Sequence, residues 1–229
     1  MTDESALPAD THPAQHPGTN PGTHPGTPAR DCPLCPRLVA YRAEQMARHA
    51  TWWNAPVPPL GDAGAWLAVV GLAPGLKGAN RTGKPFHGDE AGTMLFGTLA
   101  ALGLASETPD GWDAPGVFIT NSVACAPPGN LPTTAEKHNC RPFLAAQLAA
   151  LPALKVVLAL GETAHQAAIK AVGGKLPKYR FVHGAAHRLP SGVMLVDSYH
   201  CSRLNTNTGL LTPEMFMAAF QTAVAAKAG

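Results

Sequence analysis

The sequence lacks the long apolar runs and the leader that would direct a chain into or across a membrane. No stretch of 18 or more apolar residues occurs among its 229 residues, which excludes a membrane-spanning helix. Its first ten residues, MTDESALPAD, are polar and acidic, whereas a secretory signal begins with basic residues and continues with an apolar run. We therefore expect a soluble cytoplasmic protein.

Charge of either sign is also scarce. Lys and Arg number 17 against 15 Asp and Glu, which gives a formal net charge of +2. Residues 1–30 carry a net charge of −2, which leaves +4 for residues 31–229. Proteins with a strong electrostatic footprint for nucleic acid carry a larger excess, so this balance permits a nucleic-acid partner without indicating one.

Residues 11–29 have almost no apolar side chains. The stretch THPAQHPGTNPGTHPGTPA repeats a His/Asn-Pro-Gly-Thr unit and cannot bury enough surface to offset its chain entropy. We predict that residues 1–30 are a disordered low-complexity tail and that residues 31–229 form one domain. The three histidines of the repeat could bind a metal ion weakly, but a solvated tail is the simpler interpretation.

Short apolar runs alternate with helical patterns through the rest of the chain. The apolar runs, typical of buried parallel strands, span residues 66–71, 116–124, 153–161 and 192–198. The helical patterns span residues 37–53, 90–104, 133–151, 162–174 and 212–229. This alternation predicts an α/β fold with a mostly parallel sheet and helices on both faces. In such sheets, ligand sites form beyond the carboxyl ends of the strands.

A long glycine-rich loop follows the first predicted strand. Residues 71–92, GLAPGLKGANRTGKPFHGDEAG, contain six glycines and two prolines, too many for the interior of a helix or strand. Their spacing matches neither the phosphate-binding loop that ends in Gly-Lys-Ser/Thr nor the Gly-x-Gly-x-x-Gly dinucleotide pattern. Loops of this length inside compact domains are usually functional, and glycine lets backbone amides approach a ligand closely.

Two residues of this loop carry groups suited to a ligand. Phe86 offers an aromatic face to a planar molecule, although phenylalanine is more often a core residue. Asp89 directly precedes a predicted helix. Its carboxylate either caps that helix or lies above the sheet and orients a water molecule, and the sequence leaves both interpretations open.

Polar residues also end two of the predicted strands. Asn121 closes the second strand, where its amide can donate one hydrogen bond to a ligand and accept another; a structural amide is the alternative. His200 follows the fourth strand within SYHCSRLNTNTG. A lone histidine is often only a surface or core residue, but this one lies at the same edge of the sheet as Asn121 and the glycine-rich loop.

Four of the five cysteines are spaced like metal ligands. Cys32 and Cys35 form a Cys-x2-Cys pair, and Cys125 and Cys140 follow far downstream. No strand precedes Cys32, so the pair lacks the strand-then-helix setting of a redox motif. Four thiolates from separate segments suit either a tetrahedral zinc site or an iron–sulfur cluster, and the spacing does not distinguish the two. Cys201 is not an obvious fifth ligand.

Together these segments resemble the uracil-DNA glycosylase superfamily, most closely its type-b branch, or family 5. The matching stretches are GLAPGLKGANRTGKPFHGDEAG, ITNSVACAPPGN and SYHCSRLNTNTG, with the four cysteines, in order along residues 31–229. The resemblance implies a three-layer α/β/α sandwich around a central, mostly parallel sheet. It also implies hydrolysis of the N-glycosidic bond of uracil in DNA, the first step of base-excision repair. The apolar GLAPG segment is compatible with hypoxanthine and xanthine as further substrates.

The resemblance also implies a role for each site residue. Asp89, His200 and Asn121 would be catalytic: Asp89 orients water, His200 donates a hydrogen bond to the departing base, and Asn121 reads its edge. Sister branches have a polar or acidic residue near Leu72 and Ala73, which leaves Asp89 as the best carboxylate here. The base would be bound by Gly71, Leu72, Ala73, Gly75, Phe86, Asn121 and His200. A [4Fe-4S] cluster, in preference to zinc, would be held by Cys32, Cys35, Cys125 and Cys140.

DNA contacts are expected from the segment after His200. Arg203 and Leu204 could fill the space that the departing base vacates, since such a wedge offsets the cost of unstacking. The DNA-binding set is Arg81, Ser202, Arg203, Leu204 and Asn205. Lys77, Lys84 and the basic run 175–180 are further candidates for phosphate contacts, or solvated charges. Relatives commonly have proline directly after this histidine, and Cys201 in its place would leave the loop freer.

Two other functions remain compatible with the sequence. One is a non-catalytic or product-trapping protein that binds DNA lesions on the same fold, although such a binder would more readily have lost Asp89 or His200. The other is a zinc-stapled domain of different function, which would be colourless where an iron–sulfur protein is brown. We expect a monomer whose partner is DNA that contains uracil or another deaminated base.

Overall fold

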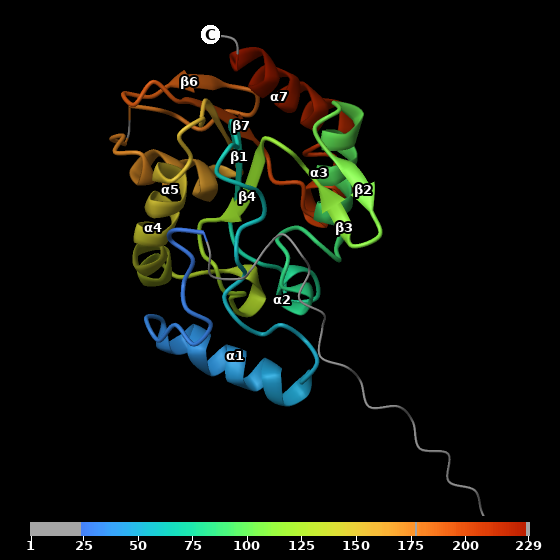
Figure 1. The fold of residues 1–229 in the computed structure, drawn as a ribbon, viewed down its shortest axis with the longest axis vertical. Coiled ribbons are helices and arrows are strands. Elements are labelled where there is room, and N and C mark those ends of the chain that lie inside the picture. Colours follow the sequence, from blue (N-terminus) through green and yellow to red (C-terminus); the bar gives the residue numbers. More distant parts are fainter. Residues whose placement is uncertain (1–23, 177, 228–229) are drawn as a thin grey trace, which may run out of the picture.

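The centre of the molecule is a five-stranded sheet, seen in a computed structural model that describes residues 24–176 and 178–227 (Figure 1). Its strands are β1 (Leu67–Gly71), β4 (Val117–Asn121), β5 (Val156–Leu160), β6 (Ala186–Arg188) and β7 (Met194–Ser198), in the order β4-β1-β5-β7-β6. Every neighbouring pair is parallel except β6 with β7. The four predicted strands are confirmed. The edge strand β6 escaped prediction because it is short and polar.

Helices cover both faces of this sheet, as the three-layer prediction requires. The helices of the described residues are α1 (Pro36–Arg48), α2 (Ala79–Thr82), α3 (Glu90–Ala101), α4 (Thr134–Ala149), α5 (Glu162–Ala171), α6 (Arg203–Asn207) and α7 (Pro213–Ala226). Figure 1 shows α4 and α5 on one side of the sheet and α3 and α7 on the other. Each face buries its own apolar cluster, one including Phe96 and Phe216 and the other Leu144 and Ile169. The central strands β1 and β5 are buried along their whole length.

Local signals in the sequence explain where the main helices begin and end. Thr133 and Glu136 form a capping box at the start of α4, in which each side chain accepts a hydrogen bond from the other residue's backbone N–H. Gly103, with φ +68°, lies just past the end of α3, where a left-handed residue ends a helix. Helix boundaries follow these caps more closely than they follow apolar spacing.

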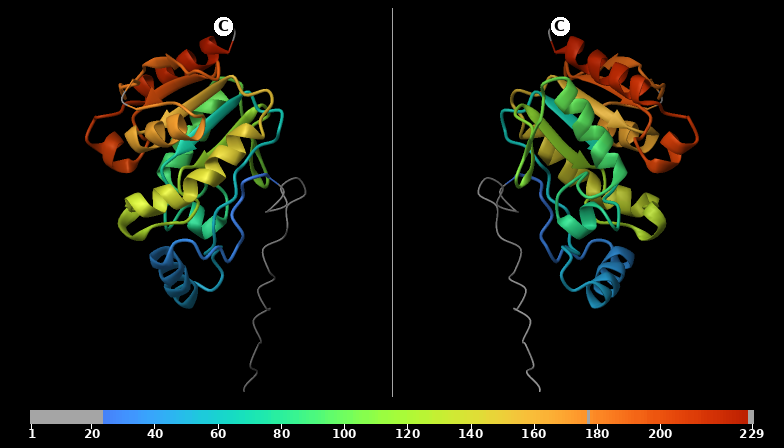
Figure 2. Two further views of the ribbon diagram at one scale, coloured as in Figure 1. Left: turned by 90° about the vertical axis from the view of Figure 1, so that its left-hand side faces the viewer. Right: turned by 90° about the vertical axis from the view of Figure 1, so that its right-hand side faces the viewer.

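The first predicted helix is too long. It was expected over residues 37–53, but α1 ends at Arg48. The backbone N–H groups of Trp53 and Asn54 donate to the carbonyls of Arg81 and Asn80 instead of continuing the helix. Contacts with α2 therefore take over the backbone hydrogen bonds of this segment. In Figure 2, α1 and α7 lie at opposite ends of the molecule.

Smaller elements complete the fold. Strands β2 (Ser106–Thr108) and β3 (Gly111–Asp113) form a separate antiparallel hairpin, and a 3-10 turn spans Pro128–Asn130. Trp112 of the hairpin stacks on Phe96 of α3, with ring centroids 5.2 Å apart. None of the helices in the described part of the chain has the length and apolar character needed to cross a bilayer.

Most of the predicted tail, residues 1–23, lies outside the described residues. The chain is packed from His24 onwards, ahead of the boundary predicted at residue 31. The side-chain amide of Gln147 donates to the carbonyl of Gly26 at 3.0 Å, and the His24 ring lies edge-on to Phe118. Gly26 has φ +78° and lies against the backbone of α4, which leaves no room for a side chain. The division into tail and domain stays a prediction.

Candidate functional site

The carboxyl ends of β1 and β4 meet where the glycine-rich loop begins. Gly71 and Asn121 are register partners on the two strands. A Cβ on Gly71 would lie 2.7 Å from Cζ of Phe86 and would overlap Oδ1 of Asn121. The absence of a side chain at Gly71 therefore lets the aromatic ring and the amide approach each other. Two residues predicted separately to face a ligand are neighbours.

Phe86 has a backbone conformation that phenylalanine rarely adopts. Its φ is +56°, in the left-handed region, and its side chain is 7% exposed. Such a conformation costs on the order of 1–3 kcal/mol and persists only where the surrounding structure imposes it. Gly92 is part of that structure, because a Cβ there would overlap the Phe86 carbonyl oxygen. Strain of this kind clusters at ligand-binding sites, which favours a ligand-facing role for the ring.

The two carboxylate oxygens of Asp89 face different groups. Oδ1 accepts a hydrogen bond from the backbone N–H of Gly92 at 3.0 Å, so Asp89 caps the N-terminus of α3. Oδ2 faces the glycine-rich loop. A Cβ on Gly75 would lie 3.1 Å from it, and a Cβ on Gly78 would overlap it. The capping interpretation is confirmed, and the second oxygen stays beside the loop that faces the sheet edge.

His200 completes this group from the end of β7. Its ring centroid lies 6.2 Å from that of Phe86, with the ring planes inclined by 27°. Burial lowers the pKa of His200 below its ordinary value of 6.5, and the negative charge of Asp89 opposes this shift without cancelling it. The imidazole is therefore neutral at pH 7 and carries one N–H that can donate to a ligand.

The segment after His200 is short and internally bonded. The Asn205 side-chain amide donates to the His200 carbonyl at 2.8 Å, and Ser202 Oγ caps α6 by accepting from the Asn205 N–H. Two large side chains project from this compact turn. Leu204 is 71% exposed, and the exposed Arg203 lies 3.6 Å from a carboxylate oxygen of Glu90. Their predicted insertion into DNA stays a prediction.

The expectation that Cys201 leaves this segment freer than proline would stays a prediction, but its side chain is anchored in the protein. Its side chain is 1% exposed and packs within the core beside α3. The thiol donates to the carbonyl of Ala91 at 3.5 Å. Burial raises the pKa of the Cys201 thiol to about 12, so it stays protonated and keeps this bond. A buried side chain thus holds the backbone here by packing, where a proline would hold it through a fixed φ.

Two basic side chains predicted to contact phosphate bond within the protein. The Arg81 guanidinium donates to the carbonyls of Lys77 at 2.9 Å and Gly88 at 3.4 Å. The Lys84 ammonium donates to the carbonyl of Asp110 at 2.6 Å, which joins the loop to the β2–β3 hairpin. Both side chains brace the loop, and their phosphate contacts stay predictions. Residue 177, within the basic run 175–180, lies outside the described residues.

The four cysteines of the metal-ligand pattern line one small cavity. Cys32 and Cys35 precede α1, Cys125 follows β4 and Cys140 lies on α4. Burial raises the pKa of the Cys125 thiol, and it raises that of Cys140 to about 12, with the neighbouring cysteines adding to both shifts. Thiolates at these positions therefore need a positive partner, as metal-ligating cysteines have.

The spacing of these sulfur atoms bears on which metal centre fits. A tetrahedral zinc ion with Zn–S bonds of about 2.3 Å holds its sulfurs about 3.8 Å apart. Among the residues that the structure describes, three ligand atoms lie within 4.8 Å of one another only in the group His165, His187 and Asp197. No three of the four cysteine sulfurs belong to such a group in the described residues, and the choice between zinc and an iron–sulfur cluster stays a prediction.

Arg42 belongs to this cysteine site and was not predicted. Its buried guanidinium donates to Sγ of Cys125 at 3.5 Å and to the carbonyl of Cys32 at 3.0 Å. Its positive charge opposes the rise in the Cys125 pKa that burial causes. The sequence did carry a signal, because Leu38, Arg42 and Gln45 recur at the spacing of one helix face. These three residues form the buried face of α1.

Comparisons with known proteins identify the family to which this chain is similar. The family model described as the Uracil DNA glycosylase superfamily matches residues 58–223. A Type-5 uracil-DNA glycosylase of Thermus thermophilus is 44% identical over 81% of this chain and 89% of its own. A Type-5 uracil-DNA glycosylase of Pyrobaculum aerophilum is 42% identical over 85% of this chain and 88% of its own. A Type-5 uracil-DNA glycosylase of Mycobacterium tuberculosis is 40% identical over 84% of this chain and 76% of its own.

Proposed function

Because the chain belongs to the uracil DNA glycosylase superfamily, we propose here how its residues remove uracil from DNA. Its relatives are Type-5 uracil-DNA glycosylases along most of their length, so the protein is a glycosylase hydrolase that removes uracil from DNA. An enzyme cannot reach the glycosidic bond inside a stacked duplex, so the nucleotide rotates out of the helix into a pocket.

The flipped base is received at the edge formed by β1 and β4. Phe86 stacks on the uracil ring, and the Asn121 amide pairs with its Watson–Crick edge. Support comes from Gly71, whose missing side chain is what allows these two groups to lie together. The strained backbone of Phe86 keeps the ring in one orientation before the base arrives, which reduces the ordering cost of binding.

Water attack at C1′ of the sugar is assigned to Asp89. The bond between C1′ and the base nitrogen breaks, the water oxygen bonds to C1′, and the proton passes from the water to the carboxylate. Oδ1 is engaged in the α3 cap, so Oδ2 is the oxygen available to the water. Positioned general bases of this kind typically contribute a rate factor of roughly 10²–10⁴.

Departure of the base is assigned to His200. Uracil leaves with negative charge on its ring oxygens, and a neutral imidazole N–H donates a hydrogen bond to one of them. The lowered pKa of His200 supports this role, because it keeps the imidazole in the neutral form that donates this hydrogen bond. An oriented donor that meets developing charge typically stabilises the transition state by roughly 2.7–4 kcal/mol.

A [4Fe-4S] cluster is proposed at Cys32, Cys35, Cys125 and Cys140. These thiolates would hold the cluster, and their iron–sulfur bonds would link the segment before α1, the loop after β4 and helix α4. The buried guanidinium of Arg42 offsets part of the negative charge of the thiolates. This centre supports the end of the sheet where the glycine-rich loop lies, and it takes no part in bond cleavage.

DNA is held, in this proposal, by the loop residues and by the segment after His200. Leu204 enters the stack where the uracil leaves, and Arg203 exchanges its exposed ion pair with Glu90 for a phosphate or a base. Ser202, Asn205 and Arg81 support the same contact surface. Because all of these contacts come from one chain, the protein is proposed to act as a monomer.

The observation that carries the catalytic proposal is the convergence of Asp89, His200 and Phe86 at one edge of the sheet. The experiment is single-turnover excision of uracil from a duplex, with strand breaks developed in alkali, for wild type and for Asp89→Asn. A second assay, with the duplex in excess over the wild-type enzyme, tests turnover, and multiple turnovers exclude a product-trapping binder. The same assay with hypoxanthine and xanthine tests whether the apolar segment at Leu72 and Ala73 admits larger deaminated bases.

A further inference from the structure

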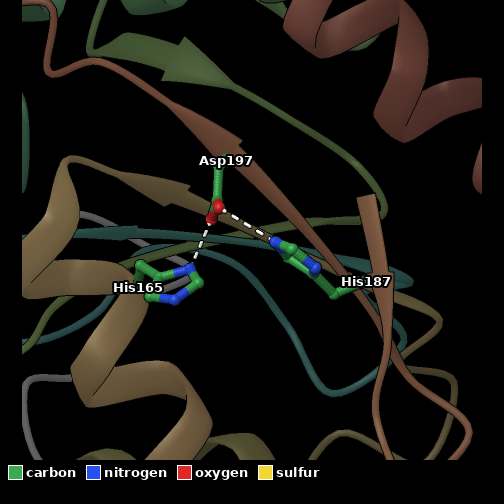
Figure 3. Close-up of side chains that lie close together, drawn as sticks. All are labelled: His165, His187 and Asp197. Atoms are coloured by element: carbon green, nitrogen blue, oxygen red, sulfur yellow. Dashed lines mark hydrogen bonds and ion pairs between the residues drawn. The ribbon is translucent and has the colours of Figure 1, made fainter. Parts of the chain in front are cut away.

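A buried cluster of two imidazoles and one carboxylate lies on the α5 side of the sheet, apart from the uracil site. Asp197 on β7 is fully buried, and Figure 3 shows His165 of α5 and His187 of β6 pointing toward it from opposite sides. His165 Nδ1 lies 2.7 Å from Oδ1 of Asp197, and His187 Nε2 lies 3.3 Å from Oδ2. The proposed chemistry uses none of the three.

The hydrogen bonds of His165 require a proton on each ring nitrogen. Nε2 faces the carbonyl oxygen of Tyr179 at 3.2 Å, and a carbonyl only accepts, so Nε2 donates. Nδ1 faces a carboxylate oxygen, and two lone pairs at 2.7 Å repel unless a proton lies between them. Both ring nitrogens of His165 thus have hydrogen-bond partners within the protein. The contact between His165 and Asp197 is satisfied by a shared proton and needs no metal ion.

The surroundings of His165 favour that proton. Burial alone would lower the pKa of His165, but the hydrogen bond and charge of Asp197 outweigh it, with further help from the Tyr179 carbonyl and from Glu162 on the same helix. The pKa is therefore raised above its ordinary value of 6.5. The other titratable group that faces the carboxylate is His187 on β6. The proton is therefore held to a higher pH than on an ordinary imidazole.

Asp197 ties β7 to the segment that precedes β6. Its backbone N–H donates to the Ala185 carbonyl at 2.9 Å, and its carbonyl accepts from the Gly184 N–H at 2.8 Å. Two residues further on, the Tyr199 N–H donates to Nδ1 of His183 at 3.0 Å, and their rings stack. The next residue is His200. Asp197 is thus three residues before His200, in a segment whose backbone is fixed by these hydrogen bonds.

A second path from the pair reaches His200 through α5. The backbone N–H of His165 donates to the carbonyl of Gly161 at 3.0 Å, and the Gly161 N–H donates to the carbonyl of Ser198 at 2.7 Å. A Cβ on Gly161 would lie 3.6 Å from Cβ of His200, so the backbone of Gly161 lies beside the position of His200. Displacing α5 from β7 would therefore move His200, because the backbone before it comes from β7 and the backbone beside it leads into α5.

We propose that His165 and Asp197 are positioning residues for His200, which they hold in place through a proton shared between α5 and β7. The inference rests on the proposed role of His200 in uracil excision. Neither residue touches the substrate. Their effect appears in the rate of the chemical step and in its dependence on pH, and not in the affinity for DNA.

The test compares His165→Gln and Asp197→Asn with the matched control Lys170→Gln, an exposed position on the same helix. Each variant is assayed for single-turnover uracil excision across pH, for affinity to an undamaged duplex, and for thermal unfolding. A misplaced catalytic group typically loses rate by roughly 10- to 100-fold, which is the expected loss for both variants. Wild type should also lose rate at alkaline pH, and His165→Gln should lack that alkaline decline. DNA affinity and the control should match wild type.

The outcomes separate this inference from the proposed function. If His200→Asn retains the wild-type rate, the role of His200 is wrong and the positioning role falls with it. If His200→Asn loses rate while His165→Gln and Asp197→Asn excise uracil like wild type, the positioning role alone is overturned, even if both variants unfold earlier. One equivalent of zinc that disappears in His187→Gln would place a metal ion where the proton is proposed. Should Asp197→Asn fail to fold, His165→Gln carries the kinetic comparison.

Discussion

The Oδ2 atom of Asp89 lies so close to Gly78 that a Cβ on Gly78 would overlap it. In the sequence, Gly78 precedes helix α2 and Asp89 follows the turn after it. The glycine-rich loop therefore folds back on itself and brings Gly78 against the carboxylate. Glycine at position 78 therefore sets the position of the carboxylate in space. This contact offers a way to displace Asp89 without changing it.

Gly78→Ala should lower the single-turnover rate of uracil excision. An added methyl group in a packed site costs about 1–3 kcal/mol unless the neighbour moves, and here the neighbour is the carboxylate assigned to water. Gly97→Ala is the matched control, because a Cβ at Gly97 meets nothing within 4 Å and alanine suits the interior of α3. Equal rates for the two variants would contradict the role assigned to Asp89.

The two functions of Asp89 can be separated by the choice of substitution. Asn is as good an N-cap as Asp, so Asp89→Asn should keep the free energy of unfolding while it lowers excision by roughly 10²–10⁴-fold. Asp89→Ala should lose both, with about 1 kcal/mol of stability from the missing cap. Denaturant unfolding and single-turnover kinetics measure the two effects. Full excision by Asp89→Asn would leave the residue only its cap.

The fold was predictable because β1 and β5 are short, wholly apolar strands separated by capped helices. Such strands have both faces covered, and a parallel sheet with helices on each side is the arrangement that provides this. The edge strand β6 and the hairpin β2–β3 could not be predicted in the same way. Their strands have three residues each and depend on tertiary partners, such as Phe96 beneath Trp112.

Site residues were predictable where function leaves a mark on local sequence. Glycines around Phe86 and polar residues at strand ends are such marks, since they contradict what a strand or helix interior favours. Arg42 and the pair of His165 and Asp197 were missed for the opposite reason. A charged residue in an apolar pattern reads as exposed until the fold supplies its buried partner.

Cys140→Ser should remove the proposed iron–sulfur centre. Wild-type protein should be brown and carry iron and sulfide, and loss of one thiolate should release both and lower thermal stability. Cys201→Ser is the control, because Cys201 is also buried but bonds to Ala91 instead of lining the cysteine cavity. It should keep its colour and iron content. A colourless wild type with one zinc per chain would overturn the cluster assignment.

Excision should depend on pH through His200 in a direction that its environment fixes. The pKa of this imidazole is lowered in the folded protein, so the neutral form needed to donate to uracil persists below the ordinary value of 6.5. On the acid side, the rate should therefore decline at a lower pH than an imidazole of ordinary pKa would give. The free energy of unfolding should also fall as pH drops below the ordinary value, because the unfolded chain binds this proton at a higher pH than the folded protein does. His200→Asn should lower the rate by about 10²–10³-fold. A wild-type rate that instead rises as the ring becomes protonated would mean that the imidazolium is the donor, and that the burial of His200 opposes catalysis.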